Sequence, residues 1–161
     1  MQISVRVEGL SKVQQKLKVT ADKLHSLKPF WETVGMYVQR QTIRERFNKE
    51  QTPDGQKWKP LAPATIRKRK KRHKRGNMKI LQDTGALRKS VAYEAGNNYV
   101  KVGSVLKYAR IHQFGGTIHF RKKKGSVTIP ARPFLGVTDK EKQHITSMFR
   151  QYIKRHILGG T

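Results

Sequence analysis

The sequence feature that most constrains the fold is an unbroken run of nine basic residues at 67–75, each of them lysine, arginine or histidine. Side chains of like charge at this density repel one another and cannot pack together in an apolar interior. Prolines and glycines punctuate the chain before the run, and Gly76 follows it directly. We therefore expect residues 50–79 to form a solvated basic loop or arm, with the packed fold built from the sequence on either side.

The charge balance of the whole chain bears on its partners. The 161 residues include 36 lysines and arginines against 10 aspartates and glutamates, which gives a formal net charge of +26. Such an excess argues against the surface of an ordinary cytosolic enzyme and indicates a polyanion or an acidic protein as partner. The length suits one hydrophobic core, so we expect a single domain spanning 1–161.

Two absences in the sequence narrow the class of protein. The chain contains no cysteine, which excludes disulfide scaffolds, thiolate metal sites and cysteine nucleophiles. No apolar stretch approaches the ~18 residues that a membrane span needs, and the first residues lack the apolar core of a secretory signal. We therefore expect no membrane partner, and synthesis in a reducing cytoplasm.

Apolar periodicity predicts helices at both ends of the chain. Residues 3–7 alternate apolar and polar side chains, as a half-buried strand does. Apolar residues then recur at steps of three or four, which predicts one amphipathic helix over about 11–27 and a second over about 29–48. Near the C-terminus, Thr138 and Glu141 form the pattern of a capping box at the start of a third amphipathic helix.

Between the basic run and the last helix, the sequence predicts two hairpins. Residues 91–95 and 99–102 read as strands joined by a glycine-asparagine turn. Residues 117–120 and 127–129 read as a second pair joined by a basic tip. Strands grouped between helices indicate an α+β fold: an antiparallel sheet of hairpins packed against N-terminal and C-terminal amphipathic helices, with a long basic loop insertion.

The sequence offers no convincing constellation for catalysis. The acidic residues are thinly spread and fall in turns or first helical turns, where capping explains them. His112 and His119 are the best-placed histidine pair, but no further ligand of suitable spacing accompanies them. The glycine pairs lack the spacing of a phosphate-binding loop. We therefore predict no catalytic residue, no cofactor and no metal, and we do not expect an enzyme.

The basic run and the basic hairpin tip are the candidate contacts for a partner. Lysines and arginines on phosphates release counterions and give affinity without sequence preference, which needs charge density more than geometry. Nucleic acid, an acidic protein surface and a solvated loop with no specific role all remain open. The candidate contact residues are Arg67, Lys68, Arg69, Lys70, Lys71, Arg72, Lys74, Arg75, Arg121, Lys122, Lys123 and Lys124.

Four segments in this order resemble the phage virion morphogenesis family, the tail-completion proteins of Mu-like and P2-like phages. They are PDGQKWKPL at 53–61, ILQDTGALRKS at 80–90, YARIHQFGG at 108–116 and IPARPFLG at 129–136. The motif and packing residues within them are Trp58, Gly85, Leu87, Tyr108, His112, Phe114, Gly115, Gly116, Arg132, Pro133, Phe134 and Leu135. Of these, Phe114, Phe134 and Leu135 are the candidate packing anchors, in the core or at an interface.

The resemblance implies a structural virion protein of the tail top or neck, which completes the tail and supports head–tail joining. It implies a homo-oligomeric ring, with a hexamer as one candidate, that contacts the tail tube or sheath and neck or connector proteins. Genome DNA is a further candidate contact. The implied location is the virion, after assembly in the host bacterial cytoplasm. The alternative function is a nonspecific nucleic-acid-binding basic protein.

Overall fold

The computed structural model describes residues 15, 18–22, 26–72, 78–120 and 124–157. The strand predicted over 3–7 lies outside these residues, and so does most of the helix predicted over 11–27. Residues 15 and 18–22, which fall within that predicted helix, are helical. The glycine pair at 159–160 also lies outside the described part of the chain.

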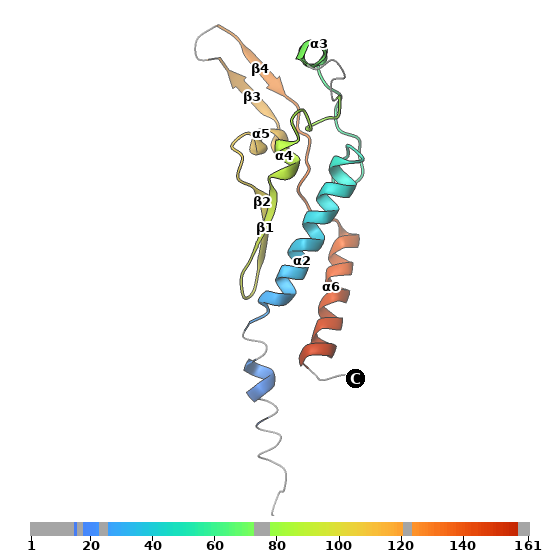
Figure 1. Cartoon of the computed structure of the whole chain (residues 1–161), viewed down its shortest axis with the longest axis vertical. Coiled ribbons are helices and arrows are strands. Elements are labelled where there is room, and N and C mark those ends of the chain that lie inside the picture. Colours follow the sequence, from blue (N-terminus) through green and yellow to red (C-terminus); the bar gives the residue numbers. More distant parts are fainter. Residues whose placement is uncertain (1–14, 16–17, 23–25, 73–77, 121–123, 158–161) are drawn as a thin grey trace, which may run out of the picture.

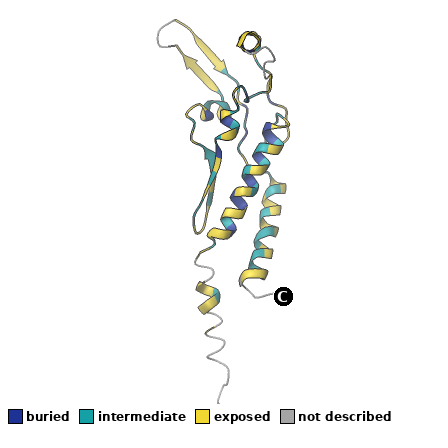
Figure 2. Ribbon diagram, viewed as in Figure 1, coloured by how far each residue is buried: buried dark blue, intermediate teal, exposed yellow. Residues whose placement is uncertain are grey.

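Helix α2 (Lys28–Gln41) is the central element of the fold. Proline in its first turn is compatible with a helix start, and the helix runs on as a π-helical segment, η1 (Thr42–Phe47). This confirms the predicted second helix. Its buried face repeats every four residues, at Phe30, Val34 and Val38. One side of α2 faces a β-hairpin and another faces the C-terminal helix α6 (Asp139–Tyr152), and Figure 2 shows the buried residues gathered along it.

The first predicted hairpin is confirmed, with strands β1 (Val91–Ala95) and β2 (Val100–Ser104) pairing antiparallel. The hairpin packs against α2 at very short range. A Cβ atom at Gly35 of α2 would lie 2.4 Å from the ring of Tyr93 on β1. Glycine is therefore required where this helix and hairpin meet, because any side chain there would force them apart.

The second predicted hairpin is confirmed as strands β3 (Gly116–His119) and β4 (Ser126–Ile129), but it does not join the first. The structure is therefore α+β, and in the described part of the chain the hairpins form two separate two-stranded sheets in place of one sheet. The short helix α5 (Ala109–Phe114) stands between β2 and β3, and the following Gly115 has a positive φ of 73°, so the chain turns away from the first sheet. In Figure 1 the β3–β4 hairpin projects away from α2 and α6.

The C-terminal helix begins with the predicted capping box, which is confirmed. The N–H of Glu141 donates to Thr138 Oγ1 at 3.2 Å, and the N–H of Thr138 donates to Glu141 Oε2 at 2.7 Å. Helix α6 packs on α2 through Phe149, whose ring centroid lies 5.1 Å from that of Phe30, and continues as η2 (Ile153–Ile157). No residue of α6 is fully buried. Among the described residues, no helix has the length and apolarity to span a bilayer.

The basic run is not a loop over its first part: residues 63–72 form helix α3 (Pro63–Arg72). The loop expected across 50–79 is therefore wrong for these residues, while 73–77 lie outside the described part. Alanine, lysine and arginine all favour helix, and proline suits a first helical turn. The repulsion that argued against regular structure is offset because Arg69 and Arg72 both pair with Asp83.

Candidate functional site

The four segments that carry the family resemblance meet in one buried cluster. Each contributes one member, namely Trp58, Leu87, Ala109 and Phe134, and Phe47 and Val91 complete the cluster. The ring centroid of Phe47 lies 5.6 Å from that of Trp58 and 5.4 Å from that of Phe134. Segments separated by up to about 80 positions thus depend on one another for burial. They form a scaffold, and residues of all four segments also line a pocket of about 370 Å³ beside α3, among them Leu61, Leu87, His112 and Arg132.

Hydrogen bonds to backbone carbonyls join the first of these segments to the fourth. Trp58 Nε1 donates to the carbonyl of Pro133 at 2.8 Å. The guanidinium of Arg132, a residue 6% exposed, donates to the carbonyls of Lys59 at 2.7 Å and Pro60 at 2.8 Å. Burial, and secondly the charge of Arg69, lower the pKa of Arg132. An arginine remains protonated at neutral pH, so these carbonyls serve as the partners of a buried cation.

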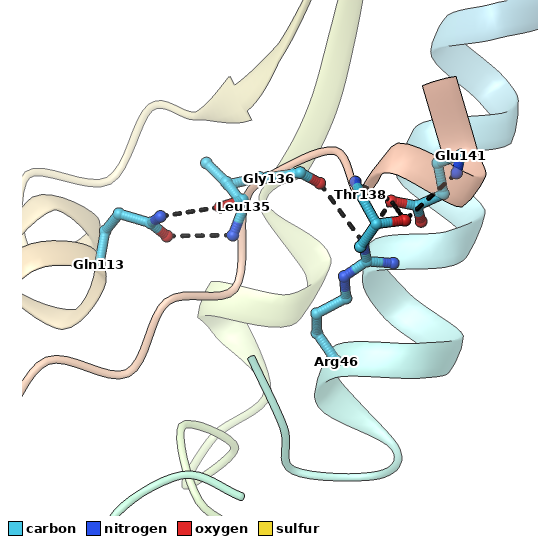
Figure 3. A network of polar contacts seen from close by, with 6 residues as sticks. All are labelled: Arg46, Gln113, Leu135, Gly136, Thr138 and Glu141. Carbon is cyan, nitrogen blue, oxygen red and sulfur yellow. Dashed lines mark hydrogen bonds and ion pairs between the residues drawn. The ribbon is translucent and has the colours of Figure 1, made fainter. Parts of the chain in front are cut away.

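Gln113, which no pattern in the sequence singled out, connects the third segment to the fourth (Figure 3). Its Oε1 accepts hydrogen bonds from the backbone N–H groups of Phe134 and Leu135, both at 3.0 Å. Its Nε2 donates to the Leu135 carbonyl at 2.8 Å. One side-chain amide therefore satisfies three backbone groups of an extended segment. Only its place inside the 108–116 segment could have drawn attention to it.

A second polar contact fixes η1 against the start of α6, as Figure 3 also shows. Arg46 Nη2 lies 2.7 Å from Glu141 Oε2, and the side chains are 3% and 12% exposed. Burial alone would raise the pKa of Glu141, but the hydrogen bonds from Arg46 and Thr138 outweigh it and hold that pKa below its usual range. The capping carboxylate of α6 is thus also the counter-ion of a buried arginine.

The structure separates the predicted basic contacts into two groups. Arg69 is buried and donates to the Lys79 carbonyl at 2.8 Å, and both Arg69 and Arg72 pair with Asp83. Arg67, Lys68, Lys70, Lys71 and Lys124 are exposed. Lys74, Arg75 and 121–123 lie outside the described residues. Asp83 was expected only as part of a turn, and its pairing with the basic helix was not predicted.

The remaining motif residues lie on or near the surface of the scaffold. Gly85 has a φ of 75° and precedes the one-turn helix α4 (Ala86–Lys89). His112 is half-buried, and burial followed by the charge of Arg132 lowers its pKa. Tyr108, Gly116 and His119 are exposed. Within the described residues, no group of three or more histidine or carboxylate side chains is placed to hold a metal ion.

The three candidate packing anchors divide between core and surface. Phe134 is fully buried and Leu135 is half-buried against the main cluster. Phe114 is 73% exposed at the end of α5, and Val105 is 93% exposed close by, where both line a surface hollow of about 470 Å³. A rigid scaffold with large exposed apolar side chains and a cationic helix is typical of a protein that acts through contacts with other macromolecules.

Comparison with known proteins assigns the chain to a protein family. The model of the phage virion morphogenesis family matches residues 9–154, so the chain belongs to that family. The resemblance drawn from the four segments is confirmed. The chain is a bacteriophage structural protein of virion morphogenesis.

Curated relatives agree with this assignment. Mu-like prophage FluMu G protein 1 of Haemophilus influenzae is 34% identical over 130 residues, which cover 79% of each chain. Tail completion protein S of Escherichia phage P2 is 29% identical over 116 residues, covering 72% of this chain and 77% of the relative. Putative capsid assembly protein G of Escherichia phage Mu is 35% identical over 74 residues, 46% of each chain. No solved structure matches the chain significantly.

Proposed function

We propose that the protein is a non-enzymatic tail-completion subunit at the tail top or neck of the virion, where it forms a homo-oligomeric ring that supports head–tail joining. The name of the P2 relative, Tail completion protein S, supports the tail-completion role. The family places the chain in virion morphogenesis. The ring, for which a hexamer is one candidate, would contact tail tube or sheath proteins on one side and neck or connector proteins on the other.

The exposed aromatic residue Phe114 is the structural observation that carries the proposal. It lies directly after Gln113, whose side chain is fixed by three hydrogen bonds to the 134–135 backbone. An exposed aromatic side chain on a backbone segment that its neighbour holds in place is suited to be an interface anchor. A protein acting alone would gain solubility from a polar residue at this position.

The β3–β4 hairpin is the counterpart that we propose for this anchor on a neighbouring subunit. Its strands are exposed on nearly every residue, including Ile118 and Val127, and Phe120 is exposed just beyond β3. An isolated two-stranded hairpin is only marginally stable in water, so covering it stabilises it. A hairpin from one subunit on the Phe114 hollow of the next is a head-to-tail contact, which closes into a ring when the rotation allows.

The oligomeric state of a Phe114→Ser variant tests this contact. In gel filtration with light scattering at moderate salt, we expect the wild type to elute as a closed oligomer and the variant to shift toward the monomer. Met36→Ser is the matched control, because Met36 is an exposed apolar residue on α2, away from the hollow. In infected cells, the Phe114→Ser variant should yield tails that fail to join heads. Normal particles carrying Phe114→Ser would contradict the proposed contact.

A further inference from the structure

Helix α3 has two faces of different character. Positions 65, 66, 69 and 72 follow the three- and four-residue spacing of one helical face. Thr65 and Ile66 are half-buried, and Arg69 is buried at 6% exposure. The exposed residues Arg67, Lys68, Lys70 and Lys71 occupy the opposite face. We call these four residues the cationic face of α3.

The inner face anchors the helix through two arginines. Arg69 Nη1 donates to the Lys79 carbonyl at 2.8 Å, and Arg69 Nε lies 3.5 Å from Asp83 Oδ1. Arg72 Nη2 donates to the other carboxylate oxygen, Asp83 Oδ2. Asp83 begins the bend before α4 and follows Leu81, which packs against the buried cluster, by two positions. The basic helix is thus attached to the scaffold by its own charges, and its outer face has a defined direction.

The cationic face is dense in charge. Its four residues fall within five consecutive positions, which rise about 6 Å along a helix at about 1.5 Å per residue. Double-stranded DNA carries one negative charge per about 1.7 Å of its axis, so the two charge densities are comparable. No acidic residue occurs in α3, and within the described residues none of the four cations pairs with a carboxylate.

The composition of this face favours nucleic acid over a protein partner. Three of its four residues are lysines, which are depleted from the cores of protein–protein interfaces. No aromatic residue occurs in α3, so the face lacks the anchors on which such interfaces depend. Phosphate contacts need charge density and no such anchor. The helix is also already folded and fixed, which lowers the entropy cost of binding.

We infer that the cationic face of α3 binds the phosphate backbone of double-stranded DNA without sequence preference. Arg69 and Arg72 act as positioning residues, because both pair with Asp83 and hold the helix; Arg69 is buried, whereas the side chain of Arg72 is 46% exposed at the edge of the inner face. This surface is separate from the Phe114 hollow, so the inference goes beyond the proposed assembly role and does not depend on the number of subunits.

Fluorescence anisotropy with a labelled duplex of about 30 base pairs tests the inference across ~50–200 mM salt. The test variant carries Arg67→Gln, Lys68→Gln, Lys70→Gln and Lys71→Gln together. The matched control removes four exposed cations from the C-terminal helical region, with Lys140→Gln, Arg150→Gln, Lys154→Gln and Arg155→Gln. Both variants lose the same net charge. Circular dichroism verifies that both keep the helix content of the wild type.

We expect the test variant to bind DNA at least tenfold more weakly than the control variant at the same salt. Its plot of log affinity against log salt should be shallower by about 0.9 for each phosphate that the variant no longer neutralises. Equal weakening in both variants would overturn the inference, because total charge would then explain binding. Absence of DNA binding by the wild type would also overturn it.

A competition experiment separates DNA from an acidic protein surface. Poly-glutamate should displace the duplex only weakly if the face is built for closely spaced phosphates. If poly-glutamate binds the wild type more tightly than DNA does, and the α3 variant loses that binding, the face recognises acidic protein and the inference is wrong. The α3 variant should still oligomerise, whereas Phe114→Ser should still bind DNA, so failure of one proposal is distinguishable from failure of the other.

Discussion

Gln113 and Leu135 are joined by two hydrogen bonds that run in opposite directions. The Leu135 N–H donates to Gln113 Oε1 at 3.0 Å, and Gln113 Nε2 donates to the Leu135 carbonyl at 2.8 Å (Figure 3). The side-chain amide thus pairs with the backbone as a neighbouring strand would. This holds α5, and with it the backbone that carries the exposed ring of Phe114, in position on the scaffold.

Replacing Gln113 by alanine should destabilise the protein by about 2–3 kcal/mol, because it removes three hydrogen bonds of about 1 kcal/mol each. Urea unfolding monitored by tryptophan fluorescence measures this, since Trp58 lies in the same core. Gln143→Ala, on the exposed side of α6, is the control and should change stability by less than about 0.5 kcal/mol. Equal effects of the two substitutions would contradict the role of Gln113.

Gly115 and Gly55 allow a matched test of backbone crowding. Both have positive φ, 73° and 88°, but a Cβ on Gly115 would lie 2.8 Å from the Ala131 backbone nitrogen, whereas one on Gly55 would meet nothing within 4 Å. Gly55→Ala should cost about 1–2 kcal/mol for the left-handed conformation alone. Gly115→Ala should cost more than about 3 kcal/mol, because the chain after β4 must also move. Thermal unfolding of both variants measures the two losses of stability. Similar losses would show that the chain around Gly115 relaxes to accommodate the added Cβ at little cost.

Local signals in the sequence predicted the local elements of the fold. The capping box at Thr138 needs only residues three apart, and each hairpin needs only two adjacent alternating runs. These features depend on little outside themselves, so they appear in the structure where they were expected. The separation of the two hairpins was not predictable in this way, because it depends on how α5 directs the chain between them.

The basic helix and the Gln113 contact show where prediction from sequence stops. A run of like charges indicates an extended loop unless the carboxylate of Asp83, which follows Arg69 and Arg72 by fourteen and eleven positions, is known to lie beside it. The three- and four-residue spacing of positions 65, 66, 69 and 72 is consistent with a helix, but the density of like charge at 67–75 favoured a loop. Gln113 carries no signal of its own, since its partners are backbone groups 21 and 22 positions away. Both relationships are tertiary, so composition and periodicity cannot show them.

Breaking the buried Arg46–Glu141 pair should cost more stability than breaking the exposed Asp139–Lys142 pair of α6. Arg46→Met leaves the Glu141 carboxylate without its cation and should cost about 3 kcal/mol, the low end for a buried pair, because Glu141 keeps 12% exposure. Lys142→Met breaks the exposed pair with Asp139 and should cost less than about 1 kcal/mol. Chemical denaturation measures both. A small loss for Arg46→Met would show that Thr138 alone satisfies Glu141.

The lowered pKa of Glu141 predicts a dependence of stability on pH. Because its pKa is lower in the folded chain, the unfolded chain binds this proton first as the pH falls. The stabilisation is therefore complete above the ordinary value of 4.5 and is lost as the pH drops through that value toward the folded pKa. Denaturation curves between pH ~6 and ~3 should show that Glu141→Gln reduces stability most at the upper end. The same substitution in an Arg46→Met background should show a weaker pH dependence.

Arg69 and Arg67 lie two positions apart on opposite faces of α3, which allows structure and surface to be separated within one basic run. Arg69→Met removes a charged hydrogen bond to the Lys79 carbonyl and should cost about 1.5–3 kcal/mol. Arg67→Met changes an exposed side chain and should stay within about 0.5 kcal/mol. Methionine keeps helix propensity close to that of arginine, so propensity does not explain a difference. In DNA binding the order should reverse at temperatures where both variants are folded, with Arg67→Met the weaker binder. If Arg69→Met leaves stability unchanged, the contacts of Arg69 do not hold α3 on the scaffold.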